Sequence, residues 1–276
     1  MMDPTPHHEP VVDQMVEVWS SLVAACTQVD AAGWESATDC PGWSVKDQVA
    51  HVVGIERMIL GDPSPDPLSE VPPHVVNEFG RINEAWVVSR RAVPGGEVLA
   101  ELVEVIDRRT GVLASMSRED FDRVGRSPLG QAPYRQFMET RIVDTWAHEQ
   151  DIRRALGRPG GRQGARESLV LEGCVQAMPY VIGKRVAPPE GTSVLFAVTG
   201  PLGRLALVAV ADGRASLVPE PAGTEASATL TMAQEVFWRL SYGRVDPSRV
   251  TASGEVQVDG DVALGHRVLD SMAFMM

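Results

Sequence analysis

The chain has 276 residues, of which 44% are hydrophobic and 22% charged, and its formal net charge is -12 at pH 7. These values are typical of a soluble globular protein and exclude a disordered chain. The negative charge repels phosphate backbones, so nucleic-acid binding is not expected. No stretch approaches the ~20 apolar residues of a membrane span, and the N-terminal sequence MMDPTPHHEP lacks the order of a signal peptide. We expect a cytoplasmic monomer that does not bind membranes.

The three cysteines, Cys26, Cys40 and Cys174, are widely spaced and form no CxxC pair. An odd number in this arrangement indicates neither a disulfide framework nor a zinc site made of thiolates. We expect reduced thiols that are mostly buried.

Apolar residues recur at helical spacing up to about residue 160. Ser44 followed by Asp47 three residues later has the pattern of a capping box, which marks the start of one helix. Proline-rich and glycine-containing connections separate the helical segments. We interpret residues 1–160 as a helical bundle with long connections. The predicted helices cover residues 11–30, 44–60, 74–93, 97–116 and 134–157.

The pattern changes after RPGGRQGAR, residues 158–166, which we interpret as a linker. One helix is predicted after it, and short β-branched runs separated by turn signals then predict strands. Helical spacing returns over residues 233–243 and 260–276, on either side of a short EVQVDG run. Helices segregated against an antiparallel sheet make residues 161–276 a smaller α+β domain. The first helix is predicted over residues 167–182, and the strands over 193–200, 204–213, 214–220 and 226–232.

The sequence RIVDTWAHEQDIRRALGRPG, residues 141–160, contains an acid and a histidine at helical spacing. Asp144 and His148 are four residues apart, so both side chains project from one face of the predicted helix. Arg141 and Asp151 lie on the same face. The pattern fits either a solvated polar face, which is common, or half of a metal site.

His51 provides a third candidate ligand, in the middle of the apolar helical stretch VAHVVGIERMIL. Two imidazoles and one carboxylate make a nitrogen and oxygen site that suits Zn, Fe, Ni or Mn. Three protein ligands leave positions open for water or substrate. The alternative is a half-buried structural histidine. The rival carboxylate, Asp47, has a simpler role in the capping box.

Asp151 can be interpreted in two ways. It either binds a ligand imidazole on the side away from the metal or is an exposed carboxylate paired with Arg154. The other histidines show no partner at ligand spacing and are interpreted as structural or exposed. They are His7, His8, His74 and His266.

Two separated signatures resemble those of the mycothiol-dependent maleylpyruvate isomerase-like proteins, members of the DinB-like superfamily. CPGWSVKDQVAHVVGIE looks like the stretch that contains the first histidine ligand of that family, and RIVDTWAHEQDIRRALGRP resembles its second signature. LTMAQEVFWRLSYGRVDP and VDGDVALGHRVLDSMA are similar to its C-terminal domain, which folds like sterol carrier proteins. The resemblance covers nearly the whole chain. It implies a DinB-like four-helix bundle over residues 1–160 and a sterol carrier-like α+β domain over residues 161–276.

Carried over position by position, the resemblance implies that His51, Asp144 and His148 are the metal ligands, with Zn as the metal we most expect. The family commonly has Glu where this chain has Asp144. Because Asp is one methylene shorter, the metal must lie nearer to the helix or Asp144 must bind it through water.

The resemblance also implies mycothiol as a cofactor and a small electrophile as the substrate. A thiol of pKa ~8.5 is deprotonated when it coordinates a divalent metal, and the thiolate can add to an electrophilic carbon. Elimination after bond rotation gives cis–trans isomerisation, whereas retention of the adduct gives S-transfer. An acidic substrate needs a cation, and Arg239 and Arg244 of the C-terminal domain are the candidates for this catalytic role.

Two other classes of function stay open from the sequence. A sterol carrier-like domain can hold apolar molecules, so the chain could be a non-catalytic small-ligand carrier or metal-binding protein. A 2-His-1-carboxylate iron oxygenase would require Fe(II) and oxygen, and no clamp for a 2-oxoacid is evident. Loss of activity with a chelator distinguishes the enzyme from the carrier.

Overall fold

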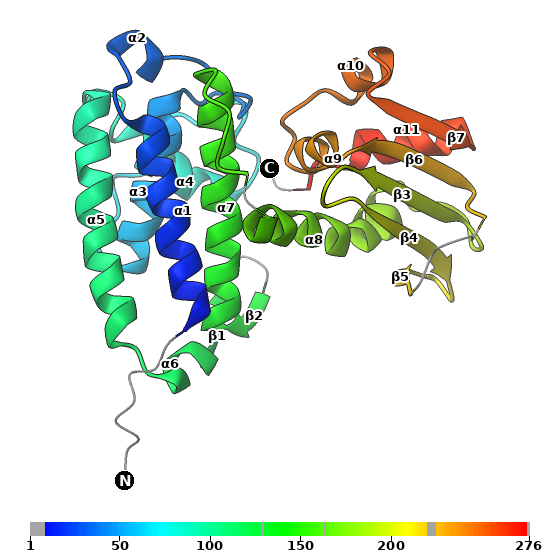
Figure 1. Ribbon diagram of the computed structural model, residues 1–276, viewed down its shortest axis with the longest axis horizontal. Coiled ribbons are helices and arrows are strands. Elements are labelled where there is room, and N and C mark those ends of the chain that lie inside the picture. Colours follow the sequence, from blue (N-terminus) through cyan, green and yellow to red (C-terminus); the bar gives the residue numbers. More distant parts are fainter. Residues whose placement is uncertain (1–8, 128–129, 163, 220–224, 275–276) are drawn as a thin grey trace. The chain divides into compact units, whose positions relative to one another are not determined.

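The computed structural model describes residues 9–127, 130–162, 164–219 and 225–274. Two compact units make up the chain, Met1–Arg162 and Gln163–Met276 (Figure 1). The first unit is helical apart from one small hairpin, and the second combines helices with a five-stranded sheet. This order confirms the fold class predicted from the sequence.

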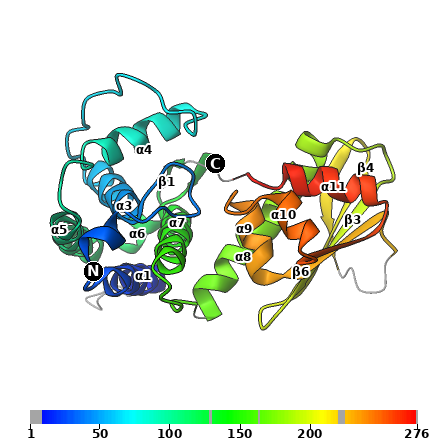
Figure 2. The ribbon, with the colours of Figure 1, turned by 90° about the horizontal axis from the view of Figure 1, so that it is seen from above.

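Four long helices form the core of the first unit. Each packs against two of the others, in the order α1–α7–α3–α5 and back to α1, so they close a ring that Figure 2 shows nearly end-on. Buried apolar side chains from all four fill the interior, among them Met15, Val49, Leu102 and Ile142. A further helix, α4 (Glu78–Val88), packs on α3 outside this ring. The four helices are α1 (Pro10–Cys26), α3 (Val45–Ile59), α5 (Gly95–Ser115) and α7 (Tyr134–Ala155).

The helix that carries His51 starts where the sequence predicts. The Ser44 side chain accepts a hydrogen bond from the backbone N–H of Asp47, and the Asp47 carboxylate accepts one from the backbone N–H of Ser44. This confirms the capping box. The predicted helix over residues 74–93 is shorter in the structure because Asn77 caps α4 with its side chain. Among the described residues of the first unit, four short elements were not predicted: α2 (Ala31–Trp34), α6 (Arg118–Asp122), β1 (Val124–Ser127) and β2 (Gly130–Pro133).

The second unit begins with a helix that starts within the predicted linker, α8 (Gly164–Tyr180), and continues into the π-helical turn η1 (Val181–Val186). A sheet of order β5–β4–β3–β6–β7 follows. Its strands are β3 (Ser193–Thr199), β4 (Arg204–Ala211), β5 (Arg214–Val218), β6 (Ala228–Ala233) and β7 (Val256–Gly260). The remaining helices are α9 (Gln234–Ser241), α10 (Pro247–Ala252) and α11 (Val262–Ser271).

The sheet is mixed, which corrects the prediction of an antiparallel sheet. β3 and β6 run parallel, with Val194 opposite Ala228, whereas the other neighbouring strands are antiparallel. β6 reaches β3 through a crossover from β5, so no tight turn sets its direction. Helices α8, α9 and α11 pack against strands of this sheet, and the rings of Phe196 and Phe237 meet at a centroid distance of 5.9 Å.

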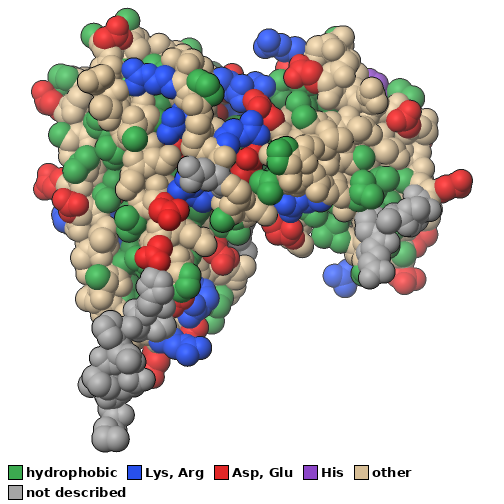
Figure 3. Space-filling model, viewed as in Figure 1, with side chains coloured by type: hydrophobic (Ala, Val, Ile, Leu, Met, Phe, Trp, Pro, Cys, Tyr) green, Lys and Arg blue, Asp and Glu red, His purple; other side chains and the backbone are tan. Residues whose placement is uncertain are grey.

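Charged side chains of both signs are interspersed with hydrophobic ones on the face of the molecule that Figure 3 shows. Among the helices that the structure describes, none combines the length and the apolar character that crossing a bilayer requires.

Limited proteolysis tests the predicted domain boundary at residues 160 and 161. Pro159, Gly160 and Arg162 are exposed, so we expect trypsin to cut after Arg162 and release a helical fragment. An Arg162→Gln variant is the control, because it should lose this cut and keep its fold. Circular dichroism that shows substantial β-structure in the released N-terminal fragment would contradict the assignment of residues 1–160 to a helical bundle.

Candidate metal centre

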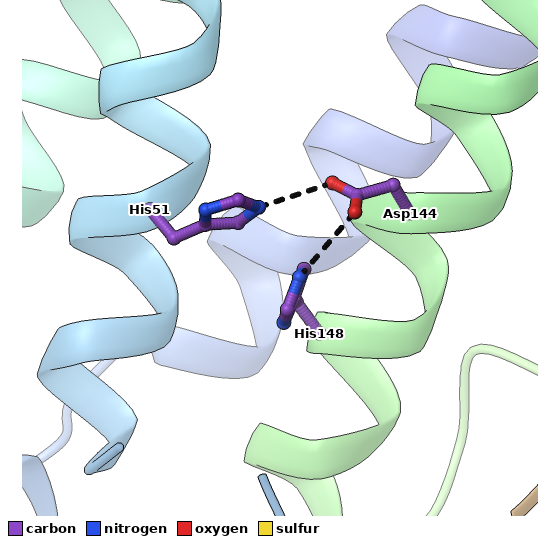
Figure 4. Close-up of side chains that lie close together, drawn as sticks. All are labelled: His51, Asp144 and His148. Atoms are coloured by element: carbon purple, nitrogen blue, oxygen red, sulfur yellow. Dashed lines mark hydrogen bonds and ion pairs between the residues drawn. The ribbon is translucent and has the colours of Figure 1, made fainter. Parts of the chain in front are cut away.

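Two helices bring the three predicted ligands together inside the first unit. His51 projects from the middle of α3, while Asp144 and His148 project from one face of α7 (Figure 4). His51 Nε2 lies 3.3 Å from Asp144 Oδ2, and His148 Nε2 lies 3.6 Å from Asp144 Oδ1. The two imidazole centroids are 4.5 Å apart. Both histidines are buried, whereas the Asp144 side chain keeps 23% of its surface exposed, so the cluster can be reached from solvent.

Residues on both sides of His148 orient its ring. His148 Nδ1 donates to Gln48 Oε1, which leaves Nε2 directed at Asp144. Asp151 Oδ2 is 4.0 Å from the same Nδ1 and 3.4 Å from Gln48 Nε2. Asp151 is 1% exposed, so the interpretation of Asp151 as an exposed carboxylate is wrong, and Arg154 pairs with Asp39 at 3.0 Å.

A buried ion-pair network lies beside Asp144. Arg141 Nη1 is 2.6 Å from Asp144 Oδ2, and its Nε and Nη2 both bind Glu56 Oε1 at 3.1 and 3.0 Å. Arg109 binds the other oxygen of Glu56 at 2.9 Å. Burial by itself would raise the pKa of Asp144, but the positive charge of Arg141 holds it well below its usual range, with smaller contributions from the neighbouring His148 and His51. Asp144 is therefore an anion at neutral pH.

Trp43 forms one wall of the cluster. Its ring lies 5.0 Å from that of His51 and 5.7 Å from that of His148, measured between centroids. Its Nε1 donates to Glu84 Oε2 at 2.8 Å, and Glu84 is fully buried. The indole is therefore held in place and restricts the rotation of both imidazoles.

The three side chains fit a divalent metal. A tetrahedral ion with bonds of about 2.1 Å places its ligand atoms about 3.4 Å from one another. The separations of 3.3 Å from His51 Nε2 to Asp144 Oδ2 and of 3.6 Å from His148 Nε2 to Asp144 Oδ1 are of this size, each to a different carboxylate oxygen. One ligand atom from each of the three residues lies within 4.8 Å of the other two. Both oxygens of Asp144 face an imidazole, so the shorter side chain still reaches its partners. Neutral imidazole and carboxylate donors suit Zn and similar borderline ions.

The other candidate residues are two arginines of the second unit and Asp47 of α3. Arg239 and Arg244 are close to one another in the second unit, where Arg239 Nη2 donates to the Arg244 carbonyl at 3.4 Å. Arg244 is 8% exposed and donates to the Tyr242 carbonyl at 2.9 Å. Their action on an acidic substrate stays a prediction. Asp47 caps α3, as expected from its capping role.

The remaining histidines do not join the cluster. His74 lies 3.1 Å from Glu84, and His266 is exposed on α11. His7 and His8 lie outside the described residues.

Three residues that contact the cluster or the ion pairs beside it were missed in the sequence: Gln48, Glu56 and Trp43. Gln48 lies three residues before His51 and thus on the same face of α3, which was an available signal. Glu56 sits at the end of an otherwise apolar stretch, where a buried acid requires a cationic partner. No local pattern indicates that the Trp43 ring turns toward the two histidines.

The fold and the cluster define a class of protein, a four-helix bundle with a candidate metal centre followed by an α+β domain. Residues 15–153 match the family described as "Mycothiol maleylpyruvate isomerase N-terminal domain". The chain belongs to this family, and its first domain is DinB-like. Residues 181–270 match the SCP-2 sterol transfer family. A search of curated proteins finds no match.

Solved structures support the same fold over nearly the whole chain. The crystal structure of the mycothiol-dependent maleylpyruvate isomerase is 15% identical, covers 92% of this chain and 93% of its own, and has a TM-score of 0.59. The structure of a mutant of that enzyme is 14% identical, with the same coverage and a TM-score of 0.57. At this identity the likeness defines the fold and not the reaction.

Proposed function

We propose that this chain is a divalent-metal- and mycothiol-dependent enzyme that adds a thiolate to a small electrophile. Its reaction is either thiol S-transfer or a cis–trans isomerisation of the maleylpyruvate type. The observation that carries the proposal is the convergence of His51, Asp144 and His148 between α3 and α7. Asp144 oxygens lie 3.3 Å from His51 Nε2 and 3.6 Å from His148 Nε2. Membership of the family and the likeness to a mycothiol-dependent isomerase support the choice of thiol.

His51, Asp144 and His148 would hold the metal, for which Zn is the first choice. A bound divalent ion supplies Lewis acidity, which turns a thiol of pKa ~8.5 into a thiolate at neutral pH. The chain supplies the orientation: Gln48 and Asp151 hold His148 from behind, and Arg141 holds Asp144. The Trp43 ring packs against both imidazoles and limits the access of water on that side.

The test is an assay of thiol consumption. Purified protein is given mycothiol and a panel of small electrophiles that includes maleylpyruvate and a chlorinated aromatic compound, with and without a chelator. We expect turnover of at least one electrophile and loss of that turnover on chelation. A rate that the chelator does not change would contradict the proposal. Binding without turnover would favour the small-ligand carrier, which the SCP-2 match of residues 181–270 makes the alternative.

The cysteines of the chain are poor candidates for the nucleophile. Burial raises the pKa of both Cys26 and Cys174 to about 12, and in Cys26 the nearby Glu149 adds to the shift. The three cysteines form no disulfide, and Cys40 is the half-buried one.

We therefore predict that a thiol reagent modifies Cys26 and Cys174 only after unfolding, while Cys40 accounts for any reaction of the native protein. Replacing each cysteine by Ser should leave the chemical step largely unchanged, because the attacking sulfur belongs to the cofactor. A collapse of turnover in one of these variants, at unchanged stability, would assign the nucleophile to the chain itself. A cytoplasmic location, where thiols stay reduced, and a monomeric state complete the proposal.

A further inference from the structure

A chain of hydrogen bonds leads from the loop before α3, through Thr38 and Gln48, to His148. At each step the chemistry of the two groups decides which one donates. The carbonyl oxygen of Trp43 can only accept, and it lies 2.8 Å from Thr38 Oγ1. Thr38 therefore donates its hydroxyl proton to Trp43, and its oxygen accepts from Gln48 Nε2 at 2.8 Å. A backbone carbonyl thus determines which end of the Gln48 amide faces Thr38.

Asp151 determines the same orientation independently. Its Oδ2 is 3.4 Å from Gln48 Nε2, and both side chains are buried. A flipped amide would place Gln48 Oε1 against a carboxylate oxygen in a buried position, which is unfavourable. Gln48 Oε1 therefore faces His148 Nδ1, and because an amide oxygen only accepts, the hydrogen of a neutral His148 is on Nδ1.

The other ring nitrogen of a neutral His148 then carries a lone pair. This Nε2 lies 3.6 Å from Asp144 Oδ1, so a lone pair faces a carboxylate oxygen. Two electron-rich atoms in this arrangement attract a cation. We propose that Gln48 is a positioning residue of the metal centre, which keeps His148, with the help of Thr38 and Asp151, in the tautomer that presents Nε2 to a metal. The tautomer follows from the geometry alone, whereas the benefit to metal binding rests on the proposed function.

Removal of the Gln48 oxygen changes the preferred hydrogen bond of His148. Asp144 Oδ1, 3.6 Å from Nε2, is then closer to the ring than Asp151 Oδ2, which lies 4.0 Å from Nδ1, and Nε2–H can reach it with a small adjustment. That proton occupies the position that a metal needs, so binding must first displace it. Partners that orient a ligand imidazole typically contribute about 10- to 100-fold in metal affinity. We expect a loss of this size in Gln48→Leu.

The first measurement is the ring tautomer of His148 in the metal-free protein, by nitrogen-15 NMR at a pH well above the usual imidazole pKa of ~6.5. The signals of His148 among the six histidines are those that disappear in His148→Ala. We expect the Nδ1–H form in the wild type and a shift toward the Nε2–H form in Gln48→Leu. A wild-type His148 in the Nε2–H form would overturn the proposal, whether or not the protein binds metal.

The second measurement is the affinity for Zn(II), in competition with a chelator. Gln150→Leu is the matched control, because Gln150 is a buried glutamine of α7 that donates to the Gly160 carbonyl at 3.2 Å. We expect Gln48→Leu to bind about 10- to 100-fold more weakly and Gln150→Leu to bind like the wild type. Equal affinity in wild type and Gln48→Leu overturns the role in metal binding. A wild type that binds no Zn(II) overturns the proposed function and leaves the tautomer result standing.

A pair of variants at Thr38 keeps the proposal testable if Gln48→Leu does not fold. Thr38→Ser retains the hydroxyl group and should keep the Nδ1–H form of His148. Thr38→Val removes the nearer of the two acceptors of Gln48 Nε2 and leaves Asp151, so only part of His148 should shift to the Nε2–H form. An unchanged tautomer in Thr38→Val would remove the hydrogen-bond chain through Thr38 from the proposal.

Discussion

His148→Ala should lose most of the bound metal and nearly all thiol-transfer activity. His148 supplies one of the three ligand atoms that converge among the described residues, and its Nε2 lies 3.6 Å from Asp144 Oδ1. Without the ion, the thiol returns to its free pKa of ~8.5 and is a few per cent thiolate at neutral pH. Lewis-acid stabilisation is worth several kcal/mol and each 1.4 kcal/mol is tenfold in rate, so we expect the rate to fall by about 100-fold or more.

The measurement combines elemental analysis with the thiol-consumption assay. Wild-type protein should carry close to one divalent ion per chain, and His51→Ala should behave like His148→Ala, because the two imidazoles flank the same carboxylate. His266→Ala is the control, since this histidine is exposed in the second unit. Equal metal content in wild type and His148→Ala would remove His148 from the site.

The parts of the site that local spacing determines could be predicted from the sequence. Asp144 and His148 share a helix, so their common face follows from a separation of four residues. The start of α3 follows from Ser44 and Asp47, which satisfy the N-terminal N–H groups within one turn. Because both helices have recognisable bounds, the angular position of each ligand on its own helix is fixed before any tertiary contact forms.

Contacts between distant parts of the chain could not be predicted in the same way. The hydrogen bond of Gln48 to His148 joins residues 100 positions apart, and that of Arg141 to Glu56 joins residues 85 apart. Such pairs depend on the packing of α3 against α7, which a periodic pattern does not specify. The prediction of an antiparallel sheet was wrong for a related reason. β3 and β6 pair in parallel, and the crossover that leads to β6 leaves no turn signal in the sequence.

Asp144→Glu should retain metal and activity, whereas Asp144→Ala should lose both. The resemblance of the second signature to the family implies Glu at this position, and the Asp144 side chain, 23% exposed, is not enclosed on all sides. Ala removes the only carboxylate in the cluster of potential ligands and leaves two neutral imidazoles, which hold a divalent ion far less well. The readouts are metal content and the thiol-consumption rate, measured side by side for the three proteins.

The neighbouring ion pairs make this comparison interpretable. Arg141 binds Asp144 Oδ2 at 2.6 Å, but it also binds Glu56 through two of its nitrogens, so in Asp144→Ala it keeps one carboxylate partner, which it shares with Arg109. We therefore expect the metal-free Asp144→Ala protein to stay folded, which thermal unfolding can check. A folded Ala variant without metal, together with an active Glu variant, identifies Asp144 as a shortened form of the family ligand. If Asp144→Glu loses metal and activity as Asp144→Ala does, the site requires the shorter side chain in the position where Arg141 holds it. Asp144 is then a distinct ligand and not a shortened form of the family Glu.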